Sequence, residues 1–227
     1  MDFNQLVQTV AIYALPVLLA ITLHEAAHGY VARHFGDMTA HAQGRISLNP
    51  VRHIDLVGTI IVPALLLAAT AGKFAFGWAK PVPVNYSALR RPRLHMALVA
   101  AAGPAANLGM LLVWAVALRT ALEFPAGSTA EFLVRLCVAG VVVNLVIMIL
   151  NLLPILPLDG GRILAGLLPE RVSAAFGRTE SLGSYLFMAF AVFGTYDTTV
   201  NDGRLVGSLF RPLNQFAVGL LRAIAST

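Results

Sequence analysis

The sequence predicts an all-α polytopic membrane protein that forms a single domain over residues 1–227. Of its 227 residues, 58% are hydrophobic and only 12% are charged, whereas soluble domains carry about 25% charged residues. The mean hydropathy is +0.76. Several apolar runs also approach the length of about 20 residues that a helix needs to cross a bilayer. A lipid bilayer is therefore the expected environment of the chain.

Four of the apolar runs are long enough for membrane helices. The first contains Pro16, where we expect a kink. We do not expect this run to be a cleavable signal peptide, because no basic stretch precedes it and no cleavage motif ends it. The predicted helices cover residues 6–31, 94–118, 132–153 and 182–200.

Residues 32–93 form an insertion between the first two predicted membrane helices, and its first part, from about residue 33 to 55, is polar. Within it, residues 39–48 alternate enough in polarity to predict a short strand. Residues 56–71 are apolar but just under the usual length of a membrane span. Residues 74–85 contain prolines, which exclude a helix and favour an extended segment. We expect a short β or re-entrant insertion, in which 56–71 turns back or pairs with the returning stretch.

The tail, residues 203–227, differs from the rest of the chain. Arg204, Arg211 and Arg222 are spaced by seven and eleven residues, so they fall within about 20° of one helical face. An interfacial amphipathic helix, interrupted near Pro212, is the expectation. Much of the opposing apolar surface comes from Leu205, Leu209, Leu213, Phe216, Leu220 and Ile224.

The charge distribution and the cysteine count bear on possible partners and on disulfides. The net charge of +5 comes mostly from arginines in the connections between apolar runs. That distribution is typical of membrane topology signals and gives no reason to expect a nucleic-acid partner. The single cysteine, Cys137, lies in an apolar run, so disulfides are not expected.

The first apolar run ends in His24-Glu25-Ala-Ala-His28. On a helix, positions four apart share a face, so both imidazoles can bind one metal ion. Glu25 lies beside them and can reach a water on that metal, which is the pattern of zinc hydrolases. Two histidines and a glutamate in an apolar helix are costly unless they share a function.

A catalytic zinc site needs three protein ligands and one open position for water. Asp159 is the acidic residue that sits just past a long apolar run and is followed by further apolar residues. Asp55 and Asp197 are alternative third ligands. Asp159 could instead cap a helix at a break rich in proline and glycine.

Three motifs give the chain a resemblance to the site-2 protease family of intramembrane zinc metalloproteases. The first is the His-Glu-Ala-Ala-His motif at the end of a membrane helix. The second is Asn151-x-x-Pro-x-x-x-Leu-Asp159-Gly, and the third, between them, is Gly103-Pro104-Ala-Ala-Asn107. The resemblance covers residues 6–163 and implies a three-helix site-2 protease core, without the PDZ or nucleotide-binding domain of larger members.

The resemblance also implies roles for individual residues. His24, His28 and Asp159 would bind one Zn2+ per chain, and Glu25 would act as the general base. Asn151 would bond the scissile carbonyl or its oxyanion. The implied function is hydrolysis of peptide bonds in or near transmembrane helices of membrane proteins, so the implied partner is a transmembrane-helix substrate.

Charge also predicts the orientation in the membrane. Both zinc motifs reach one side only if residues 32–93 cross the membrane an even number of times. The basic residues of that insertion then lie mostly on one side, which the positive-inside rule makes cytoplasmic. We therefore expect a multi-pass protein of the plasma membrane, with the N-terminus outside and the active site toward the cytoplasm.

Two other functions remain open at this point. One is a metal or ion transporter, although the sequence shows no internal repeat. The other is a catalytically silent homologue that binds membrane proteins. His53 could join the site from the cytoplasmic loop, although a loop histidine is more often structural. Asn107 and Asn144 are expected to pack helices together, as polar residues in membrane helices commonly do.

Overall fold

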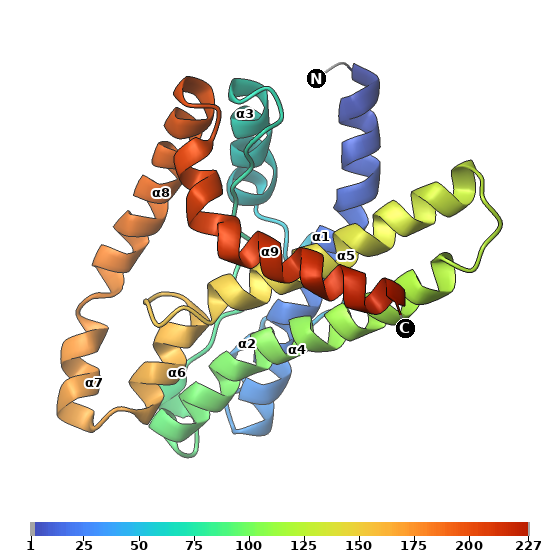
Figure 1. Ribbon diagram of the computed structural model, residues 1–227. Helices are drawn as coiled ribbons and strands as arrows, with labels where there is room; N and C mark the ends of the chain where they lie inside the picture. The colour runs from blue at the N-terminus through green and yellow to red at the C-terminus, as the bar shows by residue number, and fades with distance from the viewer. Residues whose placement is uncertain (1–2, 227) are drawn as a thin grey trace.

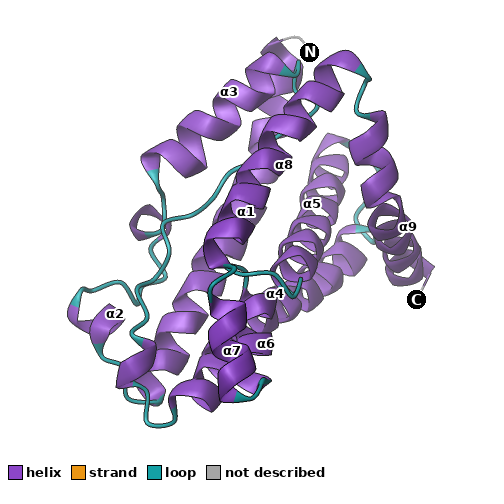
Figure 2. Cartoon of the chain, turned by 90° about the vertical axis from the view of Figure 1, so that its left-hand side faces the viewer, coloured by secondary structure: helices purple, strands orange, loops and turns teal. Residues whose placement is uncertain are grey.

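The computed structural model describes residues 3–226, which form a helical protein with no strand among these residues (Figures 1 and 2). Short 3₁₀ turns η1 and η3 and one π-helical turn, η2, lie in the insertion between α1 and α4. The helices are α1 (Phe3–His34), α2 (Thr39–Ala42), α3 (Val62–Ala69), α4 (Pro92–Ala121), α5 (Ser128–Asn151), α6 (Asp159–Leu167), α7 (Glu170–Gly177), α8 (Glu180–Val200) and α9 (Arg204–Ser226).

Helix α4 lies at the centre of the fold and packs against α1, α5 and α6. It begins at Pro92, and proline suits the first turn of a helix because its missing N–H would have no helical partner there. Between α4 and α5, the Trp114 ring lies on Gly140, where a Cβ would come within 2.1 Å of the ring. The absence of a side chain at Gly140 therefore lets the two helices approach closely.

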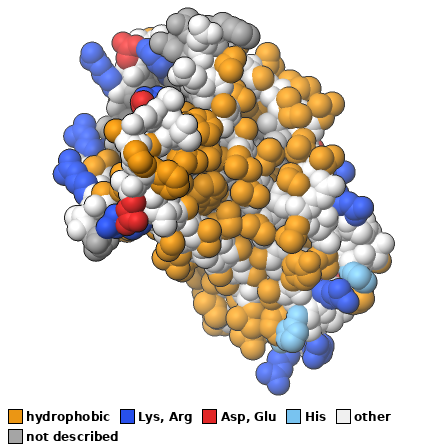
Figure 3. Space-filling view, turned by 90° about the vertical axis from the view of Figure 1, so that its right-hand side faces the viewer, with side chains coloured by type: hydrophobic (Ala, Val, Ile, Leu, Met, Phe, Trp, Pro, Cys, Tyr) orange, Lys and Arg blue, Asp and Glu red, His pale blue; other side chains and the backbone are white. Residues whose placement is uncertain are grey.

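Three of the described helices are long and apolar enough to cross a membrane: Val7–His34 of α1, and all of α4 and α5. They correspond to the predicted spans 6–31, 94–118 and 132–153. Hydrophobic side chains cover much of the face in Figure 3, and the basic side chains gather toward its ends. Helix α8 forms where 182–200 was predicted, but it is not among these three, so its crossing of the membrane stays a prediction.

The expected strand over residues 39–48 is wrong. Residues Thr39–Ala42 form the helix α2 instead. The Asp37 carboxylate accepts a hydrogen bond from the Thr39 amide at 2.9 Å, and the Arg45 amide bonds back to the Ala40 carbonyl at 2.8 Å. These local bonds close a helical turn, and no partner strand is present among the described residues to compete with it.

The apolar run 56–71 forms η2 (Leu56–Ile61) followed by α3. The chain then turns at Ala71 and Gly72, which both have positive φ, and returns as a non-helical stretch. The Trp78 amide donates to the Gly58 carbonyl at 3.0 Å. This bond joins the returning stretch to η2 at one point, while a re-entrant or paired arrangement of 56–71 stays a prediction.

The C-terminal helix α9 crosses α4 and α5 (Figure 1). It is continuous through Pro212, so the expected interruption is wrong; a proline removes one helical hydrogen bond, and the helix continues on both sides. Ala217 is buried in the cluster around Trp114, where Leu213 and Leu220 also pack. Part of the apolar face of α9 therefore covers protein, and its place at a lipid interface stays a prediction.

Candidate metal centre

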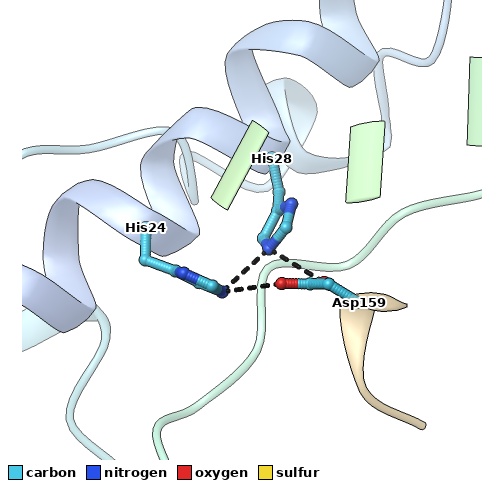
Figure 4. Close-up of side chains that lie close together, drawn as sticks. All are labelled: His24, His28 and Asp159. Carbon is cyan, nitrogen blue, oxygen red and sulfur yellow. Dashed lines mark hydrogen bonds and ion pairs between the residues drawn. The ribbon is translucent and has the colours of Figure 1, made fainter. Parts of the chain in front are cut away.

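Three side chains that can bind a metal converge between α1 and α6 (Figure 4). His24 and His28 lie one turn apart on α1, and their Nε2 atoms are 3.1 Å apart. Asp159 is the first residue of α6. Its Oδ2 lies 3.1 Å from His24 Nε2 and its Oδ1 lies 3.4 Å from His28 Nε2. All three side chains are buried, so they form a compact polar centre inside an apolar protein.

Two glycines allow Asp159 to reach this position. A Cβ on Gly160 would fall 2.2 Å from the Leu152 carbonyl oxygen, and one on Gly161 would fall 2.5 Å from the backbone of Ile155. Both distances are far below van der Waals contact, so only glycine fits at either position. The first turn of α6 therefore packs directly on the loop that follows α5, and Asp159 faces α1.

A third glycine, Gly103 of α4, backs the two histidine rings. A Cβ there would lie 2.5 Å from His24 Cε1 and 2.5 Å from His28 Nε2. Behind the rings, His28 Nδ1 lies 2.7 Å from the Val99 carbonyl oxygen, and His24 Nδ1 lies 2.6 Å from Asn107 Oδ1. Helix α4 therefore both makes room for the rings and orients them.

These contacts determine which ring nitrogens can bind a metal. The Val99 carbonyl oxygen only accepts hydrogen bonds, so His28 Nδ1 is the donor and the Nε2 of the neutral ring carries a lone pair. In the same way, His24 Nδ1 donates to Asn107 Oδ1, and His24 Nε2 carries a lone pair. Metal-binding histidines commonly have this arrangement, in which the other ring nitrogen donates to a carbonyl or carboxylate.

The three residues fit a zinc ion. Their ligand atoms all lie within 4.8 Å of one another, and the buried Asp159 Oδ2 accepts no hydrogen bond from the described residues. The Nε2 atoms of the neutral histidines and the carboxylate face one another with lone pairs only. These lone pairs repel unless a cation lies between them. Two imidazoles and one carboxylate are a known catalytic zinc set that leaves a fourth position for water.

Arg162, one turn after Asp159, holds α6 in place. Its Nη2 atom donates to Glu180 Oε1 of α8 at 2.9 Å, and its guanidinium lies 5.2 Å from the centre of the Tyr86 ring in η3 (Tyr86–Ala88). Burial raises the pKa of Tyr86 despite the nearby Arg162, so its hydroxyl stays protonated at neutral pH. The helix that carries Asp159 is thus fixed between the insertion and α8.

Glu25 lies outside the group of three potential ligands but next to it in the sequence. Its Oε2 accepts a hydrogen bond from the Val82 amide at 2.7 Å. Val82 belongs to the extended stretch, which is held on either side: the Lys80 amide donates to the His53 carbonyl at 3.0 Å, and the Asn85 amide donates to Asp37 Oδ2 at 2.7 Å. The insertion therefore fixes the orientation of the Glu25 carboxylate.

Asn151 and His53 do not enter the group. Asn151 ends α5 and is half-buried; its amide donates to the Ile147 carbonyl of its own helix at 2.9 Å. His53 is buried, and its Nε2 lies 2.7 Å from the Ser47 carbonyl oxygen. That bond gives His53 a structural role in the insertion, whereas the substrate contact of Asn151 stays a prediction.

The alternative third ligands also lie elsewhere. Asp55 caps η2 by accepting a hydrogen bond from the Gly58 amide at 2.7 Å. Asp197 is buried at the junction of α8 and α9, where it accepts a hydrogen bond from the Val206 amide at 2.8 Å. Among the described residues, the group that could hold a metal contains Asp159 and neither of these carboxylates.

Sequence reasoning assigned Asn107 to helix packing and gave no role to Val99. The structure places both against the histidines. Asn107 could have been found from the Gly-Pro-x-x-Asn motif, whose first residue makes the room and whose last reaches His24. Val99 acts through its backbone carbonyl, so its side chain carries no signal for this contact.

The model of peptidase family M50 matches residues 120–194. The chain is 37% identical over 216 residues to a Bacillus subtilis protein named "Putative zinc metalloprotease YwhC", covering 88% of this chain and 92% of that protein. It is 32% identical over 143 residues to "Putative zinc metalloprotease Rip2" of Mycolicibacterium smegmatis, covering 63% of this chain and 52% of that protein. No solved structure gives a significant match.

Proposed function

Since the chain belongs to peptidase family M50, the site-2 protease family of zinc metalloproteases, we propose that it cleaves peptide bonds in or near transmembrane helices of membrane proteins. One observation carries the proposal. The Nε2 atoms of His24 and His28 and the carboxylate of Asp159 meet at the end of a helix that is long and apolar enough to cross a membrane. One Zn2+ per chain would be held there.

The chemistry of the site follows from its residues. A zinc ion held by His24, His28 and Asp159 would supply Lewis acidity, which polarises a peptide carbonyl and makes the attacking water more acidic. Glu25, oriented by the Val82 amide, accepts the proton of the attacking water and returns it to the leaving amine. Asn151 lies at the end of α5, and its amide would turn from the Ile147 carbonyl to donate to the oxyanion.

The substrate must be partly unwound before cleavage. Carbonyls inside a helix are occupied by backbone hydrogen bonds, so segments with weak helix formers are the favoured targets. The stretch 80–85 runs past Glu25 in non-helical form. We propose that an unwound substrate lies along this stretch, by the strand addition that many proteins use to bind extended peptides.

The proposed orientation places the zinc site near the cytoplasmic face of the plasma membrane. Residues 32–93 carry many basic residues, among them Arg33, Arg90, Arg91 and Arg93, and the positive-inside rule favours the cytoplasm for them. In this arrangement the segment of η2 and α3 is re-entrant, and α9 lies at the lipid interface.

The test is cleavage of a single-pass membrane protein by the purified chain in detergent, with zinc measured on the same samples. Glu25→Gln should keep its zinc and lose cleavage. Asp159→Ala should lose both. Glu123→Gln, two residues past the end of α4, where Glu123 forms an exposed ion pair with Arg119, is the control and should behave as wild type.

Three results would count against the proposal or part of it. A wild-type protein that binds no zinc when zinc is supplied would exclude the metalloprotease. Zinc binding with full cleavage by Glu25→Gln would remove Glu25 from the mechanism. Stoichiometric zinc without cleavage of any transmembrane substrate would favour a catalytically silent binding protein.

A further inference from the structure

A row of buried amides crosses the helix core behind the candidate zinc site. Asn107 of α4 and Asn144 of α5 are both fully buried. Asn107 Oδ1 lies 2.6 Å from His24 Nδ1, and Asn107 Nδ2 donates to Asn144 Oδ1 at 3.0 Å. Asn144 Nδ2 in turn donates to the Gly140 carbonyl at 2.9 Å. The chain of hydrogen bonds thus runs from α5 through α4 to a metal-binding ring on α1.

The direction of this chain is fixed at its far end. The Gly140 carbonyl only accepts hydrogen bonds, so Asn144 must turn its NH2 group toward it and its Oδ1 toward Asn107. Asn107 must then offer its own NH2 group to Asn144, and it also donates to the Ala20 carbonyl at 3.3 Å. Its Oδ1 is left for His24, where it can only accept.

The opposite orientation is unfavourable. An inverted Asn107 would turn Oδ1 toward both Asn144 Oδ1 and the Ala20 carbonyl, placing acceptors against acceptors in a buried site where a lost hydrogen bond is costly. It would also offer an N–H to His24 Nδ1, which favours the tautomer with its proton on Nε2. That tautomer could not bind a metal through Nε2.

We infer that Asn144 is a positioning residue that sets the metal-binding tautomer of His24 through Asn107, although no hydrogen bond joins Asn144 to His24. The inference rests on the proposed zinc site and goes beyond the expectation that Asn144 only packs helices together. It also explains why two fully buried amides lie behind one zinc ligand while a backbone carbonyl suffices for His28.

The experiment measures zinc affinity in detergent by competition with a chelator of known affinity, for wild type and three variants. Asn107→Leu should bind zinc about 10-fold to 100-fold more weakly, as is usual when the partner of a metal-binding histidine is removed. Asn144→Leu should lose about threefold to tenfold, and the double variant should bind no more weakly than Asn107→Leu alone. Losses that add in the double variant would show that Asn144 acts independently of Asn107.

A second background separates tautomer control from packing more sharply. The carboxylate of Asn107→Asp can only accept a hydrogen bond from His24, whichever way it turns. In that background Asn144→Leu should no longer weaken zinc binding, whereas a packing defect would persist. Cys137→Val, a buried change two turns away on α5, is the matched control and should leave zinc affinity unchanged.

The outcomes for the two proposals are distinct. Wild-type protein that binds no zinc would overturn the proposed function and, with it, the inferred role of Asn144. Zinc binding by wild type with additive losses, or an unchanged affinity in Asn144→Leu, would overturn the role of Asn144 alone. Unfolding of the zinc-free proteins checks the fold, and Asn144→Ala makes the same test if the leucine variant does not fold.

Discussion

Gly103→Ala tests how tightly α4 constrains the candidate zinc ligands. The added Cβ would lie 2.5 Å from His24 Cε1, 2.5 Å from His28 Nε2 and 2.6 Å from His24 Nε2. Restoring even the tight separations of 3.0–3.4 Å seen for real Cβ atoms requires the rings or the helix to move by roughly 0.5–0.9 Å. The rings are held from behind by Asn107 and the Val99 carbonyl, so they cannot retreat without lengthening those bonds.

Such a displacement reaches or exceeds what a catalytic centre tolerates, which is about 0.5 Å. We expect zinc affinity to fall at least about tenfold and cleavage by about 100-fold. Alanine is favoured over glycine in a helix by about 1 kcal/mol, so the loss cannot be ascribed to weaker helix formation.

The assay is chelator competition together with cleavage of a transmembrane substrate. Gly109→Ala is the matched control: it lies on the same helix, and its Cβ would meet nothing within 4 Å. Its zinc affinity should equal that of wild type. Wild-type affinity in Gly103→Ala would refute the claim that α4 holds the rings in place.

Three further predictions follow from the same contacts. Val82→Pro removes the amide that holds Glu25 and should slow cleavage at least about tenfold with zinc content unchanged, while Val84→Pro, whose amide makes no hydrogen bond among the described contacts, should have a smaller effect. Removing zinc with a chelator should lower the thermal stability of wild type, and zinc at about 100 times its Kd should restore about 2.7 kcal/mol. The stability of Asp159→Ala should not respond to zinc. Equal responses of the two proteins would contradict the role of Asp159 as a ligand. Gly140→Ala forces a Cβ to 2.1 Å from the Trp114 ring and should destabilise the protein by about 1–3 kcal/mol. An unchanged unfolding temperature would contradict this prediction.

The long apolar runs were the most predictable part of the fold. Residues 94–118 and 132–153 became α4 and α5, each longer by a few residues at its start. The prediction was poorest in the insertion, where the pattern of residues 39–48 favoured a strand. A strand needs a partner that no local pattern can supply, whereas one Asp37 carboxylate suffices to start a helical turn at Thr39. Local hydrogen bonding therefore decided the structure of residues 39–42, against the alternating polarity of residues 39–48.

Part of the candidate site could likewise be predicted from the sequence and part could not. The spacing of His24 and His28 could be read directly, because a helix alone brings them together. Asp159 was one of three candidates from the residues themselves, since its approach depends on the missing side chains of Gly160 and Gly161. The orientation of the rings depends on contacts between α1 and α4, including a backbone carbonyl, and such contacts cannot be read from spacing within one helix.

The buried polar groups of the three core helices meet at one level of the fold. His24, Asn107 and Asn144 come from α1, α4 and α5, and each bonds to the next. Apolar packing alone would allow these helices to slide or rotate past one another, because many apolar contacts have similar energies. An amide that must face one carbonyl and one amide does not allow this, because each slip leaves a buried donor or acceptor without a partner. The residues that prepare His24 for a metal therefore also fix the register of the helices that bring Asp159 to it.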